Sequence, residues 1–557
     1  MLRALLSGFL ALFFPTAIAQ DHPAAPPSAS ATPAVASEHI CGGDGSTPAH
    51  AQLLTGYGGG GFPVATTAPA AQAFFDNGMQ LAHAFAHRAS IAAFGEAARL
   101  DPHCAMCLWG KAWASGPTIN YPIDATAMAK LEVMASDAAR LTGSGPAREQ
   151  QLTAALKLRY VNGGGTGAGD RAFAKAMDVL AERYPDDDEI ATVSADAWMI
   201  LVSLGNKAQH LTRAVALLER VLQRHPDYTP AIHFYIHATE MSGFPGRAER
   251  YADRLPALAP SASHLIHMPS HTYYWIGRYQ DAVDANVRAV AIGIDNAKRL
   301  GMTQPDGVWD LPYHAHNVQF GVGAALISGD APHALALSDP LIRVAASKDK
   351  APAFMQMVAG TGYFAEARFA DPDKVLALPE PKLPYLKAYW HYARGEAHAR
   401  IGNIAALRRE AAAIPDHLGT VKADDSSAAA ARMAAIARLV LTGRAAMLDH
   451  QPALALKAFA TATKLQEAKK FALYSDPPAW WYPVRRDMAA ALLAMGKPAD
   501  AIRMADATLI VRPKDPVTLA LRARAEAATG ATEQAATDRR AALAGWVGRL
   551  PIPLAHL

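Results

Sequence analysis

Cysteine, net charge and long apolar runs are all scarce in this sequence of 557 residues. Three cysteines cannot build a disulfide-rich scaffold. No internal stretch reaches the ~18 apolar residues that a membrane span needs. The 53 Lys and Arg residues nearly balance the 50 Asp and Glu residues, and a net charge of +3 is too small to bind nucleic acid by neutralising phosphates. These shortages exclude a disulfide-stapled domain, a multispanning membrane protein and a nucleic-acid-binding protein.

The chain does have a large supply of residues for burial. Hydrophobic residues make up 51% and charged residues only 18%, a composition that favours folded over disordered structure. The length exceeds what one compact domain usually contains. We therefore expect several domains or one extended architecture.

The first residues have the pattern of a secretory signal peptide, which we place at residues 1–19. Arg3 supplies a positive charge, Ala4 to Phe14 is largely apolar, and Ala17 and Ala19 are the small residues that precede a cleavage site at Gln20. The apolar stretch is too short for a membrane anchor. Residues 20–70 are rich in Ala, Pro and Gly and are interpreted as a tether and lead-in. The sequence thus predicts a periplasmic or secreted protein with no transmembrane segment after cleavage.

The remainder of the chain repeats a helical pattern that ends in proline. In the clearest unit, small and large apolar residues follow the spacing of a 34-residue tetratricopeptide repeat: Phe74, Gly78, Leu81, Ser90, Phe94, Ala97 and Pro102. Small residues allow two helices to approach closely, and proline ends the second helix because it lacks an N–H donor. Similar units end at Pro185, Pro226, Pro260 and Pro513. We expect an all-α tetratricopeptide-repeat solenoid of nine to ten helical hairpins over residues 71–557, with halves at 71–345 and 346–557 and a concave groove.

Several longer motifs share features with known proteins. They are Gly61 to Val64, Ala71 to Gly78, Leu100 to Gly110, Gly116-Pro117 with Asn120, Ile236 to Glu240, His267 to His271, Tyr313 to Asn317, and Pro477 to Arg486. With these motifs the chain resembles the tetratricopeptide-repeat (TPR) proteins, and more closely a poorly characterised bacterial family of exported or cytosolic members. The resemblance implies the solenoid fold and no settled reaction.

Histidine is concentrated in the middle of the chain, where seven of 21 lie between His233 and His316. His233 and His267 are one repeat of 34 residues apart, and so are His237 and His271. In TPR proteins these repeat positions line the groove. The i, i+4 spacing places each pair on one helix face, although Pro269 is expected to kink the second helix.

Imidazoles with a carboxylate are a donor set that Zn, Cu or Fe binds. The predicted metal ligands are His237, His267, His271 and His316, with Glu240 as a fifth ligand or an orienting partner. A second, weaker set of candidates is His233, His264 and His314. Two other interpretations stay open: these histidines bind a groove ligand directly, or their clustering is a coincidence of polar groove positions.

The sequence is therefore consistent with two classes of function. One is a solenoid that binds a peptide, protein or small-molecule ligand; the other is a metal-dependent hydrolase or Cu/Fe oxidoreductase built on the same scaffold. The aromatic and arginine residues Trp480, Trp481, Arg485 and Arg486 are a second candidate ligand groove, where stacking and bidentate hydrogen bonds suit an acidic ligand. Their alternative role is to cover a seam between repeats. Cys104 and Cys107 are interpreted as a structural disulfide or as small buried residues, with a redox-active pair as a third possibility.

Overall fold

A computed structural model describes residues 51–161, 167–302, 307–311, 313–416, 418, 425–472 and 476–552, with the side chain of Asp425 left out. The predicted signal peptide (1–19) and the tether up to residue 50 lie outside this part of the chain. The described residues form helices and no β-strand. None of the described helices combines the length and the apolar character that a membrane span requires.

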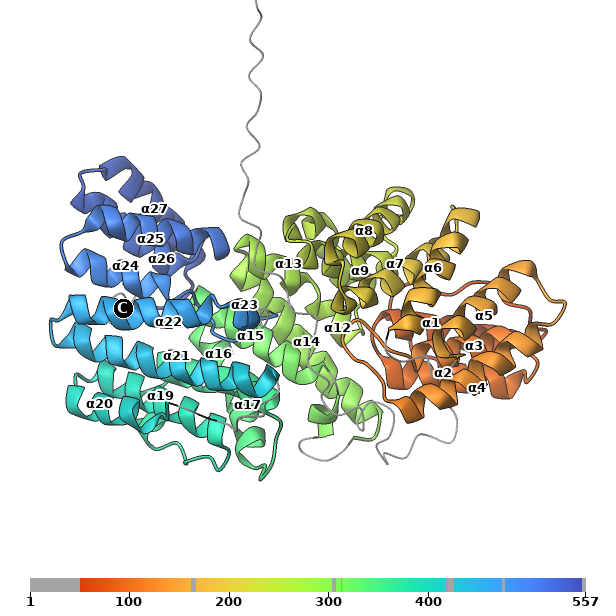
Figure 1. The fold of residues 1–557 in the computed structure, drawn as a ribbon, viewed down its shortest axis with the longest axis horizontal. Coiled ribbons are helices and arrows are strands. Elements are labelled where there is room, and N and C mark those ends of the chain that lie inside the picture. The colour runs from red at the N-terminus through yellow and green to blue at the C-terminus, as the bar shows by residue number, and fades with distance from the viewer. Residues whose placement is uncertain are drawn as a thin grey trace, which may run out of the picture.

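Helices follow one another through most of the described chain, from Pro69 to Gly545 (Figure 1). The first are α1 (Pro69–His83), α2 (His87–Leu100), α3 (Ala105–Ala114), α4 (Ala125–Thr142), α5 (Ala147–Tyr160), α6 (Ala168–Arg183), α7 (Asp188–Ile200), α8 (Lys207–Arg224) and α9 (Thr229–Met241). The middle contains α10 (Glu249–Ala252), α11 (Leu255–Leu258), α12 (Ser263–His267), α13 (Pro269–Ile276), α14 (Tyr279–Arg299), α15 (His314–Ser328), α16 (Ala331–Ala346) and α17 (Ala353–Phe369). The last are α18 (Pro372–Leu376), α19 (Pro384–Arg400), α20 (Ile404–Ala413), α21 (Asp425–Leu448), α22 (Pro452–Gln466), α23 (Lys469–Ala472), α24 (Arg485–Ala494), α25 (Pro498–Val511), α26 (Pro516–Ala528) and α27 (Thr532–Gly545). Short 3-10 helices occupy Leu201–Leu204, Pro245–Ala248 and Gly307–Asp310.

The architecture is an all-α, TPR-like solenoid, as the repeat pattern predicts. Consecutive helices pack on each other, and the repeat prolines follow helix ends: Pro102 after α2, Pro185 after α6, Pro226 after α8 and Pro513 after α25. Gly277 and Gly329 adopt φ of 81° and 83° where α13 and α15 end, a conformation that glycine adopts at little cost.

Small residues allow the helices α1, α2 and α3 to approach one another closely. Phe94 of α2 is completely buried between Gly78 of α1 and Gly110 of α3. A Cβ atom at Gly110 would lie 2.3 Å from the Phe94 ring. Ser90 adds a hydrogen bond from its hydroxyl to the Gly78 carbonyl, at 2.7 Å. The small residues of the repeat pattern are thus positions where a neighbouring ring occupies the space of a side chain.

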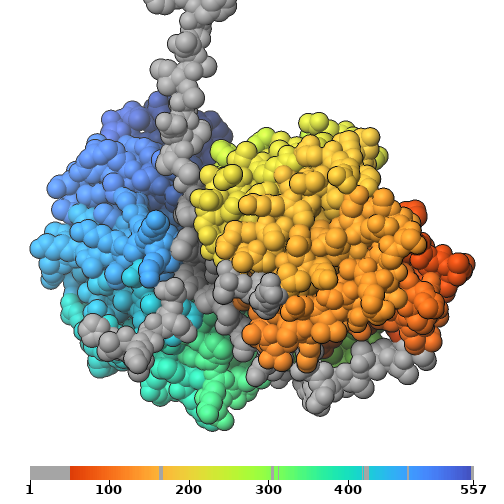
Figure 2. All heavy atoms as spheres, turned by 45° about the vertical axis from the view of Figure 1, so that its right-hand side comes forward, coloured from red at the N-terminus to blue at the C-terminus, as the bar shows by residue number. Residues whose placement is uncertain are grey.

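The solenoid curls until segments far apart in sequence touch. Before α1, residues 51–68 form no helix, and the Gly59 amide donates to Thr229 of α9 at 2.6 Å. At the other end, the Val547 amide donates to the Ser328 carbonyl of α15 at 2.9 Å. Figure 2 shows the result as two bulky lobes, one from the N-terminal and one from the C-terminal helices. This curling buries surface that an open solenoid would leave in a groove.

The contact at Gly110 gives a direct test of the repeat packing. We expect Gly110→Ala to lower the free energy of unfolding by about 1–3 kcal/mol, because the added methyl overlaps Phe94. The matched control is Gly95→Ala in α2, where a Cβ meets only the Lys111 side chain at 3.7 Å. That change is expected to stabilise by about 0.5–1 kcal/mol, because alanine is the better helix former. Thermal unfolding followed by circular dichroism measures both, and equal effects would contradict the packing described.

Candidate metal centre

Imidazoles from three neighbouring parts of the solenoid meet in one cluster. His233 and His237 lie on α9, His264 and His267 on α12, and His271 on α13. His316 joins them from α15. Two groups of three have ligand nitrogens within 4.8 Å of one another: His233 with His237 and His264, and His267 with His271 and His316. The two groups adjoin, with the His237 and His271 rings 5.1 Å apart. We call these six residues the histidine cluster.

His267 and His271 face each other through their Nε2 atoms, which are 2.9 Å apart. The opposite nitrogen of His267 is held by Asn286: Nδ1 lies 2.6 Å from the amide oxygen. That oxygen must be the acceptor, because the Asn286 amide nitrogen donates to the Ala282 carbonyl. His267 Nδ1 therefore carries a proton, and its Nε2 presents a lone pair to His271.

Carboxylates hold His271 in the same way. Its Nδ1 donates to Glu240 at 2.8 Å and lies 3.1 Å from an oxygen of Asp476, a separation that forms an ion pair without hydrogen-bond alignment. Glu240 also accepts a hydrogen bond from Trp275 at 2.7 Å. A carboxylate behind the far nitrogen is the usual arrangement for a metal-binding histidine, since it fixes the ring and raises its basicity.

In the group formed by His233, His237 and His264, a backbone carbonyl takes the place of the side-chain acceptor. His233 Nδ1 donates to the carbonyl of His83 at 2.7 Å, which leaves its Nε2 to face His264 Nε2 at 3.1 Å. His237 Nε2 and His264 Nδ1 are buried and have no hydrogen-bond partner among the described residues. Buried polar atoms without partners are costly, so each marks a position where a ligand atom would be stabilising.

Burial sets the charge state of the cluster. All its members are buried except His316, which is half-buried. Burial and neighbouring imidazoles hold the pKa of His237, His264 and His267 well below the usual value, and burial lowers the pKa of His316 to about 4. These four are neutral near pH 7, which is the form that binds a metal.

His271 behaves differently from its neighbours. Burial opposes its protonation, but Asp476 and Glu240 outweigh that effect and raise its pKa to about 10. Burial likewise acts to raise the pKa of Asp476, and His271 outweighs it, so that pKa is lowered. In the metal-free protein the proton on His271 bridges to His267.

The break between α12 and α13 lets His267 and His271 converge. Pro269 has no N–H to donate, and the helix is interrupted at Met268, as the sequence predicts. The His271 amide bonds to the Met268 carbonyl at 3.1 Å, a tighter turn than an α-helix.

His314 lies outside the cluster. It packs against Trp309 with ring centroids 4.6 Å apart. Residues two apart on a helix point to different faces, so His314 and His316 of α15 separate. Two partners in the centre were not predicted from the sequence: Asp476 and Asn286. Asp476 directly precedes the Pro477 to Arg486 motif, whereas nothing in the sequence around Asn286 signals its role.

The four residues of the second candidate ligand groove do not all lie together: some line a cavity, and the others lie outside it. Trp481 and Arg486 line a cavity of about 1090 Å³ to which both halves of the chain contribute residues. Trp480 instead packs between Phe364 and Tyr392 in the core, as a seam-covering residue would. Arg485 lies away from the cavity lining and forms an ion pair with Glu467, because consecutive helix residues point in different directions.

Cys104 and Cys107 form a disulfide at the start of α3. Both residues are buried, at 1% and 0% exposure, so the bond is the structural disulfide anticipated from the sequence. It fixes the turn that leads from the first repeat into the second.

No protein-family model matches this chain, and no curated protein matches it. Among solved structures it is similar to a human IFIT1 dimer with m7Gppp-AAAA, at 13% identity over 86% of this chain and 91% of that chain, with a TM-score of 0.30. It is also similar to the TPR domain of P58(IPK), at 14% identity, 63% and 92% coverage and a TM-score of 0.18. The Cut9-Hcn1 structure gives 13% identity, 86% and 88% coverage and a TM-score of 0.24. At such values the likeness concerns helical repeats and says nothing of ligands.

The carboxylate behind His271 is expected to matter for folding as well as for geometry. Replacing Glu240 with alanine leaves the buried His271 and Trp275 donors without this acceptor, and should cost about 3–5 kcal/mol of stability. The matched control is Glu467→Ala, which removes a more exposed ion pair with Arg485 and should cost less than about 1 kcal/mol. Calorimetry of chelator-treated protein measures both, and equal losses would contradict a buried role for Glu240.

Proposed function

We propose that this protein is an exported, TPR-like solenoid that binds a transition metal, Zn, Cu or Fe, in the histidine cluster. The single observation that carries the proposal is the facing Nε2 atoms of His267 and His271, 2.9 Å apart while other groups occupy both Nδ1 atoms. Two lone pairs aimed at each other need a cation between or beside them. In the metal-free protein a proton serves, and a metal ion is the stronger candidate because further imidazoles surround the pair.

The donor set fits a borderline transition metal better than Ca²⁺ or Mg²⁺, which prefer oxygen ligands. His267, His271 and His316 would be the ligands, with His237 from the adjoining group as the fourth. Glu240, Asp476 and Asn286 would orient these rings through their outer nitrogens. Zn would bind here as a stabilising ion, and Cu or Fe would add redox chemistry.

Binding is favoured over turnover by the burial of the donors. A hydrolase or oxidoreductase must bring a substrate to the metal, whereas the imidazoles here are buried apart from the half-buried His316. The solenoid would use this ion to hold α9, α12, α13 and α15 together, and would offer its cavity to a peptide, protein or small-molecule ligand.

Metal analysis tests the proposal directly. Protein purified without a histidine tag is expected to contain a stoichiometric transition metal, measured by inductively coupled plasma mass spectrometry. The double variant His267→Ala, His271→Ala should lose it, and Asn286→Ala should weaken binding by about 10- to 100-fold, because the His267 ring is no longer oriented. The control is His333→Ala at the exposed start of α16, which should retain the metal. Metal-free protein that does not take up Zn, Cu or Fe would refute the proposal.

Export is supported by the signal-peptide pattern and by the Cys104–Cys107 disulfide, a bond typical of oxidising compartments. We expect the chain expressed in a Gram-negative host to be recovered from the periplasm with Gln20 as its first residue. Mass spectrometry of the intact protein measures this cleavage. Recovery of the full-length chain from the cytoplasm would contradict it.

A further inference from the structure

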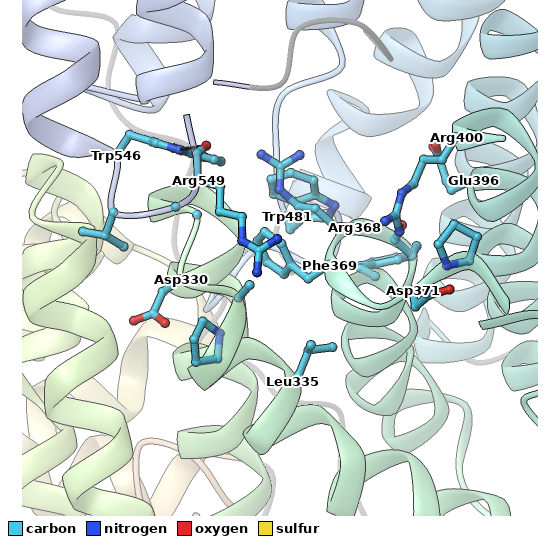
Figure 3. Close-up of a pocket in the computed structure, with 18 of the residues that line it drawn as sticks. Asp330, Leu335, Arg368, Phe369, Asp371, Glu396, Arg400, Trp481, Trp546 and Arg549 are labelled. Atoms are coloured by element: carbon cyan, nitrogen blue, oxygen red, sulfur yellow. Dashed lines mark hydrogen bonds between the residues drawn. The ribbon is translucent and has the colours of Figure 1, made fainter. Parts of the chain in front are cut away.

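The cavity of about 1090 Å³ is separate from the histidine ligands and is lined by residues from both halves of the chain. Its walls come from α14, α16, α17, α19, α21 and α24, from Trp481 before α24, and from residues 546–551 after α27. Figure 3 shows Arg368, Phe369, Trp481 and Arg549 in the middle of this space, with Asp330 and Trp546 to one side. Asp371, Glu396 and Arg400 lie on the other side. The volume is that of a site for a small organic ligand.

Arginine is the commonest charged residue of the lining. The five are Arg368, Arg400, Arg444, Arg486 and Arg549, against three carboxylates, Asp330, Asp371 and Glu396. Most of these cations have partners inside the protein. Arg444 pairs with Glu396 and Asp487, Arg400 donates to the carbonyls of Ala367 and Ala370, and Arg486 pairs with Asp515 at 3.3 Å.

Arg368 differs from these three arginines. Its Nε and Nη2 atoms are buried and have no hydrogen-bond partner among the described residues. A second guanidinium, that of Arg486, lies nearby, and its own Nε is also buried without a partner. Burial, with Arg486 adding to it, lowers the pKa of Arg368 to about 9. Arg368 as a whole is half-buried, but leaving these two nitrogens buried without an acceptor for their N–H groups costs free energy.

Aromatic rings surround part of the Arg368 guanidinium, but they offer no hydrogen-bond acceptor to its Nε and Nη2 atoms. The Arg368 guanidinium carbon lies 4.9 Å from the Trp481 ring centre and 5.6 Å from that of Trp546. Arg486 lies 5.1 Å from the same Trp481 ring. Ring faces attract a cation, but they do not replace an acceptor for a buried N–H group. The missing component is an anion.

We propose that this cavity is a receptor for a small organic oxyanion, a carboxylate or phosphate carried on a flat apolar body. The oxyanion accepts hydrogen bonds from Arg368 and from Arg486 Nε, and the apolar body lies against Trp481, Trp546 and Phe369. A planar guanidinium fork suits two oxygens of either head group. This inference extends the ligand-binding part of the proposed function by naming the ligand chemistry, and it does not depend on a bound metal.

The test uses four probes on chelator-treated protein: phenylacetate, phenyl phosphate, inorganic phosphate and the neutral phenylacetamide. Isothermal titration calorimetry and tryptophan fluorescence measure their affinities. At least one aryl oxyanion is expected to bind, and the preferred head group identifies carboxylate or phosphate as the source. Phenylacetamide should bind at least about tenfold more weakly, because it brings no charge to Arg368. Inorganic phosphate should also be weaker, because it has no apolar body.

Variants separate a ligand-binding role from a structural one. Arg368→Gln should reduce oxyanion affinity by about tenfold or more, and Arg368→Lys should restore only part of it, because lysine lacks the fork. The control is Arg485→Gln at the start of α24, outside the cavity lining, which should leave affinity unchanged. Arg368→Gln should also keep or raise the melting temperature, because it removes an unpaired buried charge. A purely structural arginine would lower it.

Three results would overturn the receptor: no probe binds, the neutral amide or inorganic phosphate binds as tightly as the aryl oxyanions, or Arg368→Gln binds them unchanged. The double variant His267→Ala, His271→Ala distinguishes this proposal from the metal site. Oxyanion binding should persist in that variant, and metal binding should persist in Arg368→Gln. Each proposal can therefore fail while the other stands.

Discussion

Hydrogen bonds to the outer nitrogens of buried imidazoles are the interaction on which the centre of this protein depends. An imidazole has two nitrogens and, when neutral, one proton, so an acceptor at Nδ1 decides what Nε2 presents. Asn286 does this for His267, Glu240 for His271 and the His83 carbonyl for His233. The rings then turn their Nε2 atoms toward one another, and in the metal-free protein the proton on His271 bridges to His267.

Curling of the solenoid makes these contacts possible. The groups that meet at the centre come from distant parts of the chain as well as from its middle. His83 is the last residue of α1, in the first repeat, and Asp476 lies in the loop before α24. An open superhelix would leave the histidines on a solvent-exposed concave face, where water would form hydrogen bonds with the ring nitrogens. Closure removes that water, lowers the effective dielectric and makes every unpaired nitrogen costly.

The loop before α24 connects the two proposed sites. Asp476 lies beside His271 at one end, and Trp481 lines the arginine-bearing cavity further along. Tyr274, one turn after His271, donates a long hydrogen bond of 3.4 Å to the Trp481 carbonyl. The same short segment therefore places a carboxylate among buried histidines and an aromatic ring between buried arginines. In both places like groups are crowded together: imidazoles in the histidine cluster and guanidinium groups in the cavity lining.

Local patterns in the sequence were sufficient for the repeat architecture, because small residues, turn glycines and terminal prolines act within one hairpin or between neighbours. The same periodicity placed His233, His237, His267 and His271 on facing helices, and the helix break at Pro269 followed from its missing N–H. Only the tertiary structure decided the rest. Asp476 and Asn286 reach the cluster from elsewhere in the chain, and His314 turns away because neighbouring helix positions diverge. Arg368 is unusual because two of its nitrogens are buried without a hydrogen-bond partner. Such burial depends on contacts between repeats that are distant in sequence, and no local sequence pattern encodes it.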